Sequence, residues 1–308
     1  MPRAESRARG DRSPFHESSG DLRDEPSADD FAELGAWAAR IRATDDAHYC
    51  YLNLFPNYAP CETLKTDSYR EYVNRFDREV PLQLLSFDHY PVVGDTCRPE
   101  WYENLEIFSD EARKAGKPFW AFALATAHEP YPIPDLAQLR LQVYSDLAYG
   151  AQGIQYFTYW TPEKNPTWDF HHAPVERSSG RRTDVYDKIK QMNAEIRALS
   201  GVFLGCEVVS VRHTGESIPR GTVRLTELPD GVKKLETTGA GAVVSELRNG
   251  NNRFIVIVNR DFKNSMTLQI ELDETASRIL KDGSVVPASI YHETMVVEPG
   301  DAMIYMFK

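Results

Sequence analysis

The sequence predicts a mixed α/β protein in which a partial (β/α)8 barrel is followed by an antiparallel β-sandwich. Between residues 48 and 160, apolar runs of strand length alternate with amphipathic helical stretches. Alternation at a constant interval is typical of repeated βα units and a parallel sheet. After Gly201 this pattern is replaced by short alternating runs that turn residues separate, which is typical of a sandwich.

The composition is that of a globular protein without a nucleic-acid or membrane partner. The 308 residues are 42% hydrophobic and 26% charged, with a net charge of -11. Phosphate binding needs a basic face, so this charge argues against nucleic acid. No apolar run is long enough to span a bilayer, and the first twenty residues lack the apolar centre of a secretory signal. We expect residues 1–20 to be a disordered tail and leave the localisation open, with a longer, secreted or periplasmic parent as one alternative.

The parallel strands are the most regular feature of the sequence. Four of them begin 34, 36 and 35 residues apart: His48–Phe55, Leu82–Asp88, Pro118–Ala125 and Gly153–Tyr159. Their nearly continuous apolar character fits strands that are covered on both faces. A further strand is expected to end at Asp24.

A helix is expected after each of these strands. Ser27 is a suitable N-cap for the first helix, with Asp30 at its third position, and Gly116 and Gly150 stand where C-caps belong. The later helices are predicted from their apolar stripes: Ser68–Glu79, Glu100–Ala115, Leu136–Tyr149 and Asp184–Leu199.

Residues 21–200 therefore hold five βα units, whereas a closed barrel has eight. The sequence predicts that the N-terminal units are missing and that the chain is the C-terminal part of a longer protein. A doubly wound open sheet is the competing fold, and it is disfavoured because no Gly-rich phosphate loop opens a helix.

Residues 202–308 are predicted to form the sandwich domain. Turn signals such as Asn249-Gly250, Asp282-Gly283 and Pro299-Gly300 separate several of its expected strands. These strands are Val202–Val211, Thr222–Leu228, Ala242–Leu247, Phe254–Val258, Met266–Leu272 and Met295–Phe307.

Polar and aromatic residues gather where the parallel strands end, which is the face that carries active sites in barrels. Glu25, in Asp24-Glu25-Pro26, could protonate a glycosidic oxygen if a second carboxylate faced it. Asp88 and Glu129 are the candidates for that second carboxylate. Each has an alternative interpretation: Glu25 as a favourable charge at a helix start, Asp88 as an acceptor for loop amides, and Glu129 as a solvated loop residue.

A sugar is the ligand that these strand ends suit, because aromatic rings pack on its C–H faces while amides and imidazoles bond its hydroxyls. Filling of the core is the alternative role for the aromatic residues. The predicted sugar-binding residues are Asn57, Tyr58, His89, Tyr90, His128 and Trp160.

No metal ion or cofactor is implied. The four cysteines form no C-x-x-C pair, and the adjacent His171 and His172 make a poor chelate. Cys61 and Cys97 fall in loops after neighbouring strands, so a disulfide between them is an option in an oxidising compartment. The sequence also lacks the Gly-x-Ser-x-Gly elbow of serine hydrolases.

Several segments, in their order, resemble the C-terminal part of a retaining glycoside hydrolase with a (β/α)8 barrel, in the clan that includes the family 42 β-galactosidases. Asp24-Glu25-Pro26 resembles the triplet that ends the fourth strand of that clan, whose Glu is the acid/base. The other segments resemble the later strands and the closing helix: Ser86–Pro91, Lys117–Trp120, Gly153–Trp160 and Tyr186–Asn193.

This resemblance implies that Glu25 is the acid/base and that Trp160 lines the sugar site. The clan's nucleophile is a Glu at the end of the seventh strand, but Phe119–Ala125 contains no carboxylate. We therefore expect a glycoside hydrolase-like protein for β-linked sugars, in a truncated chain. The alternative is a non-catalytic carbohydrate-binding protein. Unpaired sheet edges would favour aggregation or dimerisation of the isolated chain, and they leave its activity and oligomeric state open.

Overall fold

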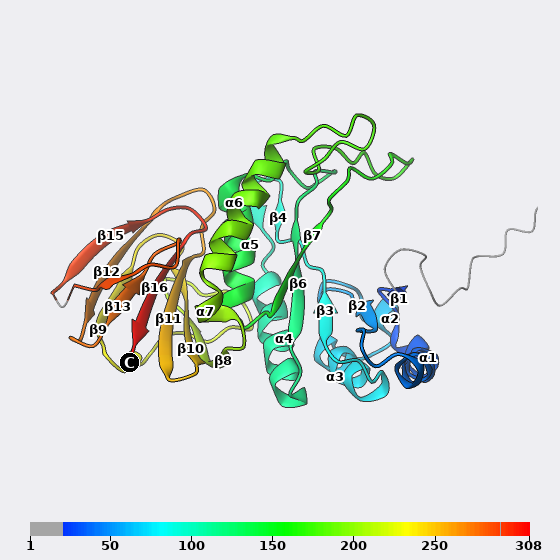
Figure 1. Cartoon of the computed structure of the whole chain (residues 1–308), viewed down its shortest axis with the longest axis horizontal. Coiled ribbons are helices and arrows are strands. Elements are labelled where there is room, and N and C mark those ends of the chain that lie inside the picture. Colours follow the sequence, from blue (N-terminus) through cyan, green and yellow to red (C-terminus); the bar gives the residue numbers. More distant parts are fainter. Residues whose placement is uncertain (1–20, 290) are drawn as a thin grey trace, which may run out of the picture.

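The computed structural model describes residues 21–289 and 291–308. The tail predicted for residues 1–20 lies outside the described residues. The remaining chain forms a parallel βα part and a part made of antiparallel sheets, as Figure 1 shows. The fold is therefore mixed α/β, as the sequence predicts.

Five parallel strands follow one another in chain order. They are β1 (Asp21–Asp24), β2 (Tyr51–Asn53), β3 (Leu85–Phe87), β6 (Phe119–Leu124) and β7 (Gly153–Phe157). Parallel pairing joins β1 to β2, β3 to β6 and β6 to β7. A parallel bridge between Leu54 and Phe87 links β2 to β3, where the Leu54 amide donates to the Ser86 carbonyl over 2.9 Å. The strand order does not reverse within this series, whereas a doubly wound sheet has a reversal point.

A helix follows each strand of this series, within a few residues of the predicted bounds. These helices are α1 (Phe31–Thr44), α2 (Cys61–Leu64) with α3 (Tyr69–Glu79), α4 (Trp101–Ala115), α5 (Leu136–Ala148) and α6 (Asp184–Ala198). A short 3-10 turn, Ala28–Asp30, precedes α1, and there the Ser27 amide donates to the Asp30 carboxylate over 3.0 Å. Gly116 ends α4 with a φ of 64°, as expected of a C-cap glycine.

Close helix packing fixes the N-terminal units. A Cβ atom on Gly35 of α1 would lie 2.1 Å from the Glu79 carbonyl oxygen at the end of α3. This close approach lets the ring of Phe31 pack 5.3 Å from the rings of both Tyr72 and Phe76. All three rings are fully buried, so glycine at position 35 permits the apolar contact between the two helices.

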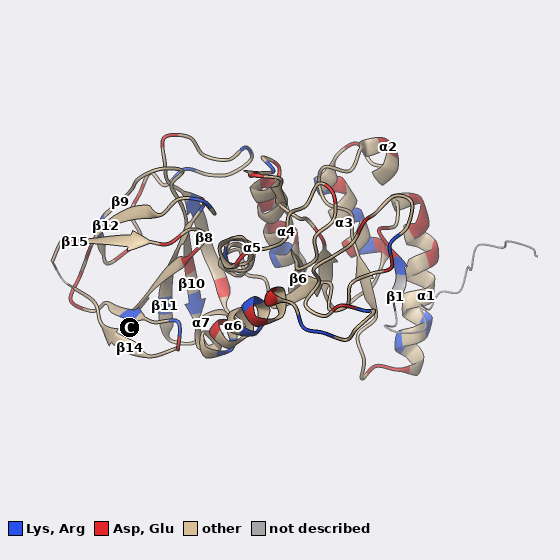
Figure 2. Ribbon diagram, turned by 90° about the horizontal axis from the view of Figure 1, so that it is seen from above, with Lys and Arg blue, Asp and Glu red and all other residues tan. Residues whose placement is uncertain are grey.

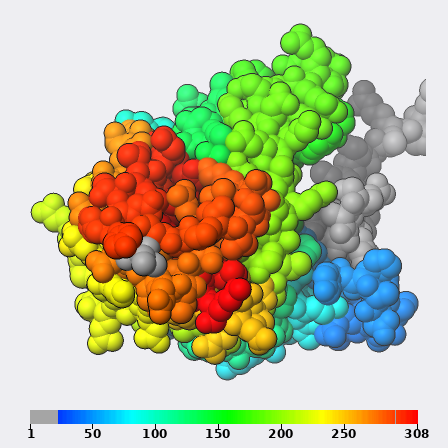
Figure 3. Space-filling model, turned by 60° about the vertical axis from the view of Figure 1, so that its left-hand side comes forward, coloured from blue at the N-terminus to red at the C-terminus, as the bar shows by residue number. Residues whose placement is uncertain are grey.

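The antiparallel part contains two larger sheets. One has the order β14 (Val285–Pro287), β13 (Ser277–Ile279), β16 (Ala302–Phe307), β11 (Asn252–Asn259), β10 (Ala242–Asn249), β8 (Glu207–His213). The other has the order β15 (Glu293–Val297), β12 (Met266–Leu272), β9 (Val232–Thr237). Side chains of both sheets, among them Val244, Ile257, Leu268 and Ile270, share one buried cluster. Figure 3 shows this part, coloured yellow to red, against the green segment that includes α6.

Three predictions for this part are wrong in detail. Thr222–Leu228 forms no strand but only a bridge from Arg224 to His213, because Val223 and Leu228 are exposed and no buried face aligns the segment. Residues Ser200–Phe203 form a helical turn, α7, before β8 begins. The predicted strand Met295–Phe307 is divided into β15 and β16 by the turn at Pro299-Gly300.

Five short strands were not predicted. In the antiparallel part these are β9, β13 and β14, and between β3 and α4 a small hairpin is formed by β4 (Val92–Val93) and β5 (Thr96–Cys97). Most of them are too short to show an alternating pattern, so sequence periodicity alone does not reveal them.

Helix α5 joins the two parts of the molecule. Seen from above, it lies between the antiparallel strands and β6 (Figure 2). The Ser245 hydroxyl of β10 donates to the Ala148 carbonyl at the end of α5 over 2.6 Å. Just beyond α5, the Tyr149 hydroxyl donates to Glu106 over 3.0 Å and lies 2.8 Å from Nε2 of the fully buried His213. These polar contacts add to a buried apolar cluster that the two parts share.

An ionic network adds to this interface. Arg140 of α5 donates to Glu195 of α6 over 2.6 Å and lies 3.6 Å from Asp301, which precedes β16. The hydroxyl of Tyr144 also donates to Glu195, over 2.7 Å, and Lys281 pairs with Asp301. The charges are largely buried, so they stabilise the interface only while every partner is present.

Candidate functional site

The first strand ends in a bend that holds Glu25. The Glu25 amide donates to the Asn53 carbonyl over 3.0 Å, which continues the pairing of β1 with β2. Glu25 has a φ of 45°, a left-handed conformation that a residue with a side chain adopts only under constraint. The hydroxyl of Tyr72 on α3 donates to the Pro26 carbonyl over 2.6 Å and so holds the bend from below.

Two of the predicted carboxylates meet at this bend. The side chains of Glu25 and Asp88 interact across the ends of β1 and β3, where the negative charge of Asp88 raises the pKa of Glu25. The amide of Asn53 donates to Asp88 Oδ1 over 2.7 Å from the strand between them. Two carboxylates that interact in this way repel each other, so their proximity favours a proton on one of them.

A chain of polar side chains supports Asn53 from within the sheet. The Ser86 hydroxyl donates to Asn53 Oδ1 over 3.1 Å and lies 2.9 Å from the Tyr51 hydroxyl. Gln155 of β7 donates to both hydroxyls, over 2.9 and 3.2 Å. Hydrogen bonds therefore connect β7, β2 and β3 to the carboxyl pair and fix the position of Asp88.

Burial controls the protonation of the pair. Burial first, and then the negative charges of Asp88 and Asp24, raise the pKa of Glu25 to about 8. Burial also raises the pKa of Asp88, although its interactions with Asn53 and Tyr90 oppose this shift. Two carboxyl groups in such contact titrate as a pair, and the first proton is lost at lower pH than the second. Near neutral pH we therefore expect one shared proton.

Aromatic residues and an arginine lie beside this pair. The negative charge of Asp88 helps to raise the pKa of Tyr90, and the Tyr90 ring centroid lies 5.9 Å from that of Tyr131. The Arg98 guanidinium lies 4.4 Å above the centre of the Tyr58 ring and donates to the Tyr131 hydroxyl over 3.1 Å. These contacts bring Tyr58 and Tyr90, both predicted from the sequence, to the same side of the site.

Two further predicted residues have structural roles at the rim. His89 is buried against Tyr58, with ring centroids 5.0 Å apart, and burial lowers its pKa to about 3, so its ring is neutral. The Asn57 side-chain amide donates to the Glu100 carbonyl over 2.9 Å and so anchors the loop to the start of α4. Both residues support the site from behind, and the sugar contacts predicted for them stay predictions.

The remaining predicted residues lie beyond the strand ends of β6 and β7. His128 is buried among aromatic rings, 4.7 Å from both Tyr131 and Phe170 between centroids. Trp160 is 47% exposed and packs edge-on against Tyr159. Glu129 is exposed on a loop, where its backbone amide donates to Asp169 over 3.2 Å. The structure thus pairs Glu25 with Asp88, and Glu129 lies on the surface.

Sequence reasoning missed Tyr51, Asn53, Ser86, Arg98, Tyr131 and Gln155. A signal for three of them was present, because Asn53, Ser86 and Gln155 are polar residues inside apolar strands. A polar side chain in a buried strand needs a partner, and at a strand end that partner is often functional. Arg98 and Tyr131 lie in loops, where no periodic pattern could have indicated them.

The structure adds three observations on other sites. Within residues 21–289 and 291–308, no group of three or more His, Cys, Asp and Glu side chains could hold a metal ion. All four cysteines, Cys61 and Cys97 included, are free thiols. None of the described helices has the length and apolar character needed to cross a bilayer.

Residues 49–199 match the family model Glyco_hydro_42, described as beta-galactosidase. The chain resembles the family 42 β-galactosidases. The family 42-like segment includes Asp88 and Glu129, whereas Glu25 precedes it. No curated protein matches the chain.

Solved glycosidase structures are also similar to the chain. A β-galactosidase from Halorubrum lacusprofundi is 17% identical with a TM-score of 0.43, over 56% of this chain and 26% of that enzyme. A β-galactosidase from Marinomonas ef1 is 14% identical with a TM-score of 0.42, over 56% and 27%. An α-amylase from Geobacillus thermoleovorans is 9% identical with a TM-score of 0.47, over 90% and 57%. The chain thus spans about a quarter of the length of the two β-galactosidases.

Proposed function

We propose that this chain is part of a glycoside hydrolase for β-linked sugars, in which Glu25 donates the proton to the leaving oxygen. The observation that carries this proposal is the interacting pair of Glu25 and Asp88 at the ends of two parallel strands, with Asn53 from the strand between them bound to Asp88. A carboxyl group that stays protonated near neutral pH is what acid-assisted cleavage of a glycosidic bond needs. The family 42-like segment supports the same class of reaction.

In this proposal, residues 21–200 are five consecutive units of a (β/α)8 barrel and residues 202–308 are a β-sandwich domain. The parallel strands support the first assignment because they follow chain order with a helix after each one. The apolar cluster shared by the two antiparallel sheets supports the second. The barrel arrangement would place Tyr58, Tyr90 and Trp160 around a sugar above the carboxyl pair.

Asp88 is proposed to keep the proton on Glu25. In this role Asp88 acts through Glu25, because its negative charge raises the pKa of Glu25 and the Asn53 amide holds Asp88 in place. Attack on the sugar then comes from another group.

Glu129 is the remaining candidate for that group. It lies on the exposed loop after β6, beyond the segment where the clan carries its nucleophile. Reaching the sugar would require the loop to bring its carboxylate inward. Replacement of Glu129 by Gln is expected to lower turnover only if Glu129 activates the attacking water.

A non-catalytic carbohydrate-binding protein is the second candidate function. The specific observation in its favour is the absence of a carboxylate from Phe119–Ala125. Such a protein would bind saccharides through the same aromatic residues and would not hydrolyse them.

The two functions are separated by measuring hydrolysis and binding on the same protein. Release of nitrophenol is followed with a panel of nitrophenyl β-glycosides, and binding of the free sugars is followed by calorimetry. The protein is expressed with whatever sequence precedes residue 1 in its gene. Glu25→Gln is expected to lower turnover by about 10²–10⁴-fold. The exposed Glu163 serves as control, since Glu163→Gln should leave turnover unchanged. Equal turnover in Glu25→Gln and wild type would reject Glu25 as the acid, and binding without any hydrolysis would favour the second candidate.

A further inference from the structure

Two adjacent histidines meet in the loop between β7 and α6. Nδ1 of His171 lies 2.8 Å from Nδ1 of His172, and the two ring planes are inclined at 83°. Successive side chains of a strand or a helix point in different directions, and on that basis the sequence predicts a poor chelate. His172 departs from this rule because its φ is 53°, a left-handed conformation, and the two imidazoles come together.

Contacts on both sides hold His171 in place. Its amide donates to the Ala127 carbonyl over 2.9 Å, and its carbonyl accepts from the Ala127 amide over 3.0 Å. Asp169 Oδ2 lies 3.9 Å from Nε2 of His171, and the Glu129 amide donates to Asp169 Oδ1 over 3.2 Å. A carboxylate beside one nitrogen of an imidazole favours the hydrogen on that nitrogen and leaves the other nitrogen as a ligand. His171 therefore presents a bare Nδ1, and His172 donates its Nδ1 hydrogen to it.

Both imidazoles are open to solvent. The side chain of His171 is 40% exposed, and His172 is exposed as well. They border a cavity of about 660 Å³, whose charged lining is balanced between carboxylates and cations: Glu163, Glu176, Lys164 and Arg177. A small cation can therefore reach both Nδ1 atoms, and its affinity comes from the imidazoles rather than from the charge of the cavity.

We propose that His171 and His172 bind a copper(II) ion through their two Nδ1 atoms. A ligand nitrogen lies about 2.0 Å from such an ion, so two bonds at a right angle hold the nitrogens about 2.8 Å apart, whereas tetrahedral bonds hold them about 3.3 Å apart. The observed 2.8 Å is the right-angle value. Right angles between nitrogen ligands are typical of copper(II), which also binds such sites more tightly than the other divalent metals of its row.

Binding requires one change of tautomer. The Nδ1 hydrogen of His172 passes to solvent while Nε2 of the same ring takes one up, so the ring stays neutral and both Nδ1 atoms offer lone pairs to the ion. No group of three or more His, Cys, Asp and Glu side chains in the described part of the chain could hold a metal, so water fills the remaining positions of the copper ion. The inference does not depend on the proposed function.

Titration of the full chain with copper(II) tests the inference. Citrate is present as a competitor, because its oxygen ligands remove weakly held copper without adding nitrogen. Calorimetry should give one copper(II) per chain, and the electron paramagnetic resonance spectrum should be axial and split by two nitrogen nuclei. His171→Gln and His172→Gln should each lower the affinity more than about 10-fold, and Asp169→Asn should lower it about 10-fold.

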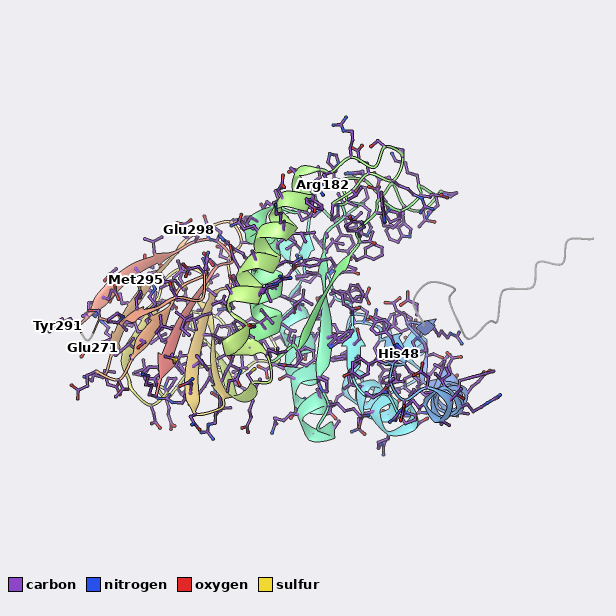
Figure 4. The ribbon with its side chains drawn as sticks, viewed as in Figure 1. His48, Arg182, Glu271, Tyr291, Met295 and Glu298 are labelled. Carbon is purple, nitrogen blue, oxygen red and sulfur yellow. The ribbon has the colours of Figure 1, made fainter. Side chains whose placement is uncertain are left out.

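His48→Gln is the matched control. His48 is also an exposed histidine beside a carboxylate, with Nδ1 2.9 Å from Asp45 Oδ2, but it has no second imidazole as a neighbour. Figure 4 shows it on a different part of the molecule from Arg182, which lies near the end of the loop that carries the histidine pair. This variant should bind copper(II) as the wild type does.

Three results would overturn the inference. These are equal affinity in wild type and in the double variant of His171 and His172, a spectrum of the wild type without two nitrogen ligands, and tighter binding of zinc(II) than of copper(II). The spectrum needs no variant, so a variant that fails to fold leaves the test intact. Glu25→Gln should bind copper(II) like the wild type, so failure of the proposed function and failure of this inference are separate results.

Discussion

Glu25 combines an uncommon backbone conformation with an uncommon protonation state. Its left-handed φ of 45° costs about 1–2 kcal/mol in a residue with a side chain. Its carboxyl group is half-buried, and the neighbouring negative charge of Asp88 helps to raise its pKa. Both features are stabilised from outside the residue, by Tyr72 at the bend and by Asn53 at the carboxyl pair. Strain that the surroundings maintain in this way is common at functional sites.

The raised pKa of Glu25 predicts how stability depends on pH. The folded state binds this proton more tightly than the unfolded state, where the pKa is near 4.5. Below pH 4.5 Glu25 is protonated in both the folded and the unfolded state, so its raised pKa does not lower the free energy of unfolding. As the pH rises from there to about 8, folding must retain a proton that the unfolded chain releases, so stability falls. Relative to Glu25→Gln, the wild type should lose about 1–3 kcal/mol of unfolding free energy between pH 5 and pH 9.

Urea denaturation of both proteins across this pH range measures the difference. The other titrating groups are common to both proteins, so their contributions to the pH dependence cancel in the difference. Asp88 is the exception, because it interacts with Glu25. Parallel pH profiles would mean that Glu25 is not buried beside a second carboxyl group.

The residues of the site were predictable in part. Glu25 and Asp88 follow apolar strands, so their convergence could be expected once the strands were recognised as parallel. The interaction between their side chains could not, because it depends on the bend at Pro26 and on how β1 and β3 are staggered. Arg98 and Tyr131 come from loops whose conformation is decided by tertiary contacts alone.

Helices and strands differ in how well the sequence predicted them. The apolar stripes gave the main helices almost to the residue, since each stripe extends over several turns. Strands of two or three residues, such as β4 and β14, have no period to detect. Thr222–Leu228 has strand-like residues without a buried face, and it therefore forms a single bridge.

Two glycines in the same conformation allow packing to be separated from backbone strain. Gly300 and Gly239 have φ values of 67° and 64°. A Cβ atom on Gly300 would lie 2.1 Å from the Ala137 carbonyl oxygen of α5, whereas one on Gly239 would meet nothing within 4 Å. Both alanine variants should lose about 1 kcal/mol through the left-handed conformation. Gly300→Ala should lose about 1–3 kcal/mol more through the clash.

Thermal and urea unfolding of the two variants check this expectation. Equal losses of unfolding free energy in Gly300→Ala and Gly239→Ala would contradict the close contact between the turn before β16 and α5.

At the scale of the whole molecule, the parallel and antiparallel parts share one buried apolar cluster, which includes Leu141 of α5 and Val243 and Val256 of the antiparallel part, and buried polar contacts add to it. The sequence predicted both parts, with a change of pattern near residue 201. It did not indicate the interface, since Arg140, Glu195 and Asp301 are far apart in the chain and look like ordinary surface charges.

Glu195→Ala tests the role of this interface. Removal of the carboxylate leaves Arg140 buried with only the more distant Asp301, and it takes the acceptor from Tyr144. Loss of one partner of a buried pair costs about 3–5 kcal/mol. The control is Glu163→Ala, because the pair of Glu163 with Arg177 is exposed and should contribute less than about 1 kcal/mol.

Unfolding free energies of both variants, followed by far- and near-ultraviolet circular dichroism, give the comparison. If Glu195→Ala were as mild as Glu163→Ala, the ionic network around Arg140 would contribute little to the stability of the interface.

The imidazole of His213, at the interface between the two parts, determines how that interface responds to acid. Tyr149 has a single hydroxyl hydrogen and donates it to Glu106, so Nε2 of His213 must carry the hydrogen in their mutual bond. The other ring nitrogen is then bare, and no described group reaches it. Burial lowers the pKa of His213 to about 3, so its imidazole is protonated at mildly acidic pH only after the interface around it has opened. The stability that neutral His213 contributes is fully present above pH 6.5 and is lost as the pH falls toward 3. We therefore expect acid to open the interface between the two parts first.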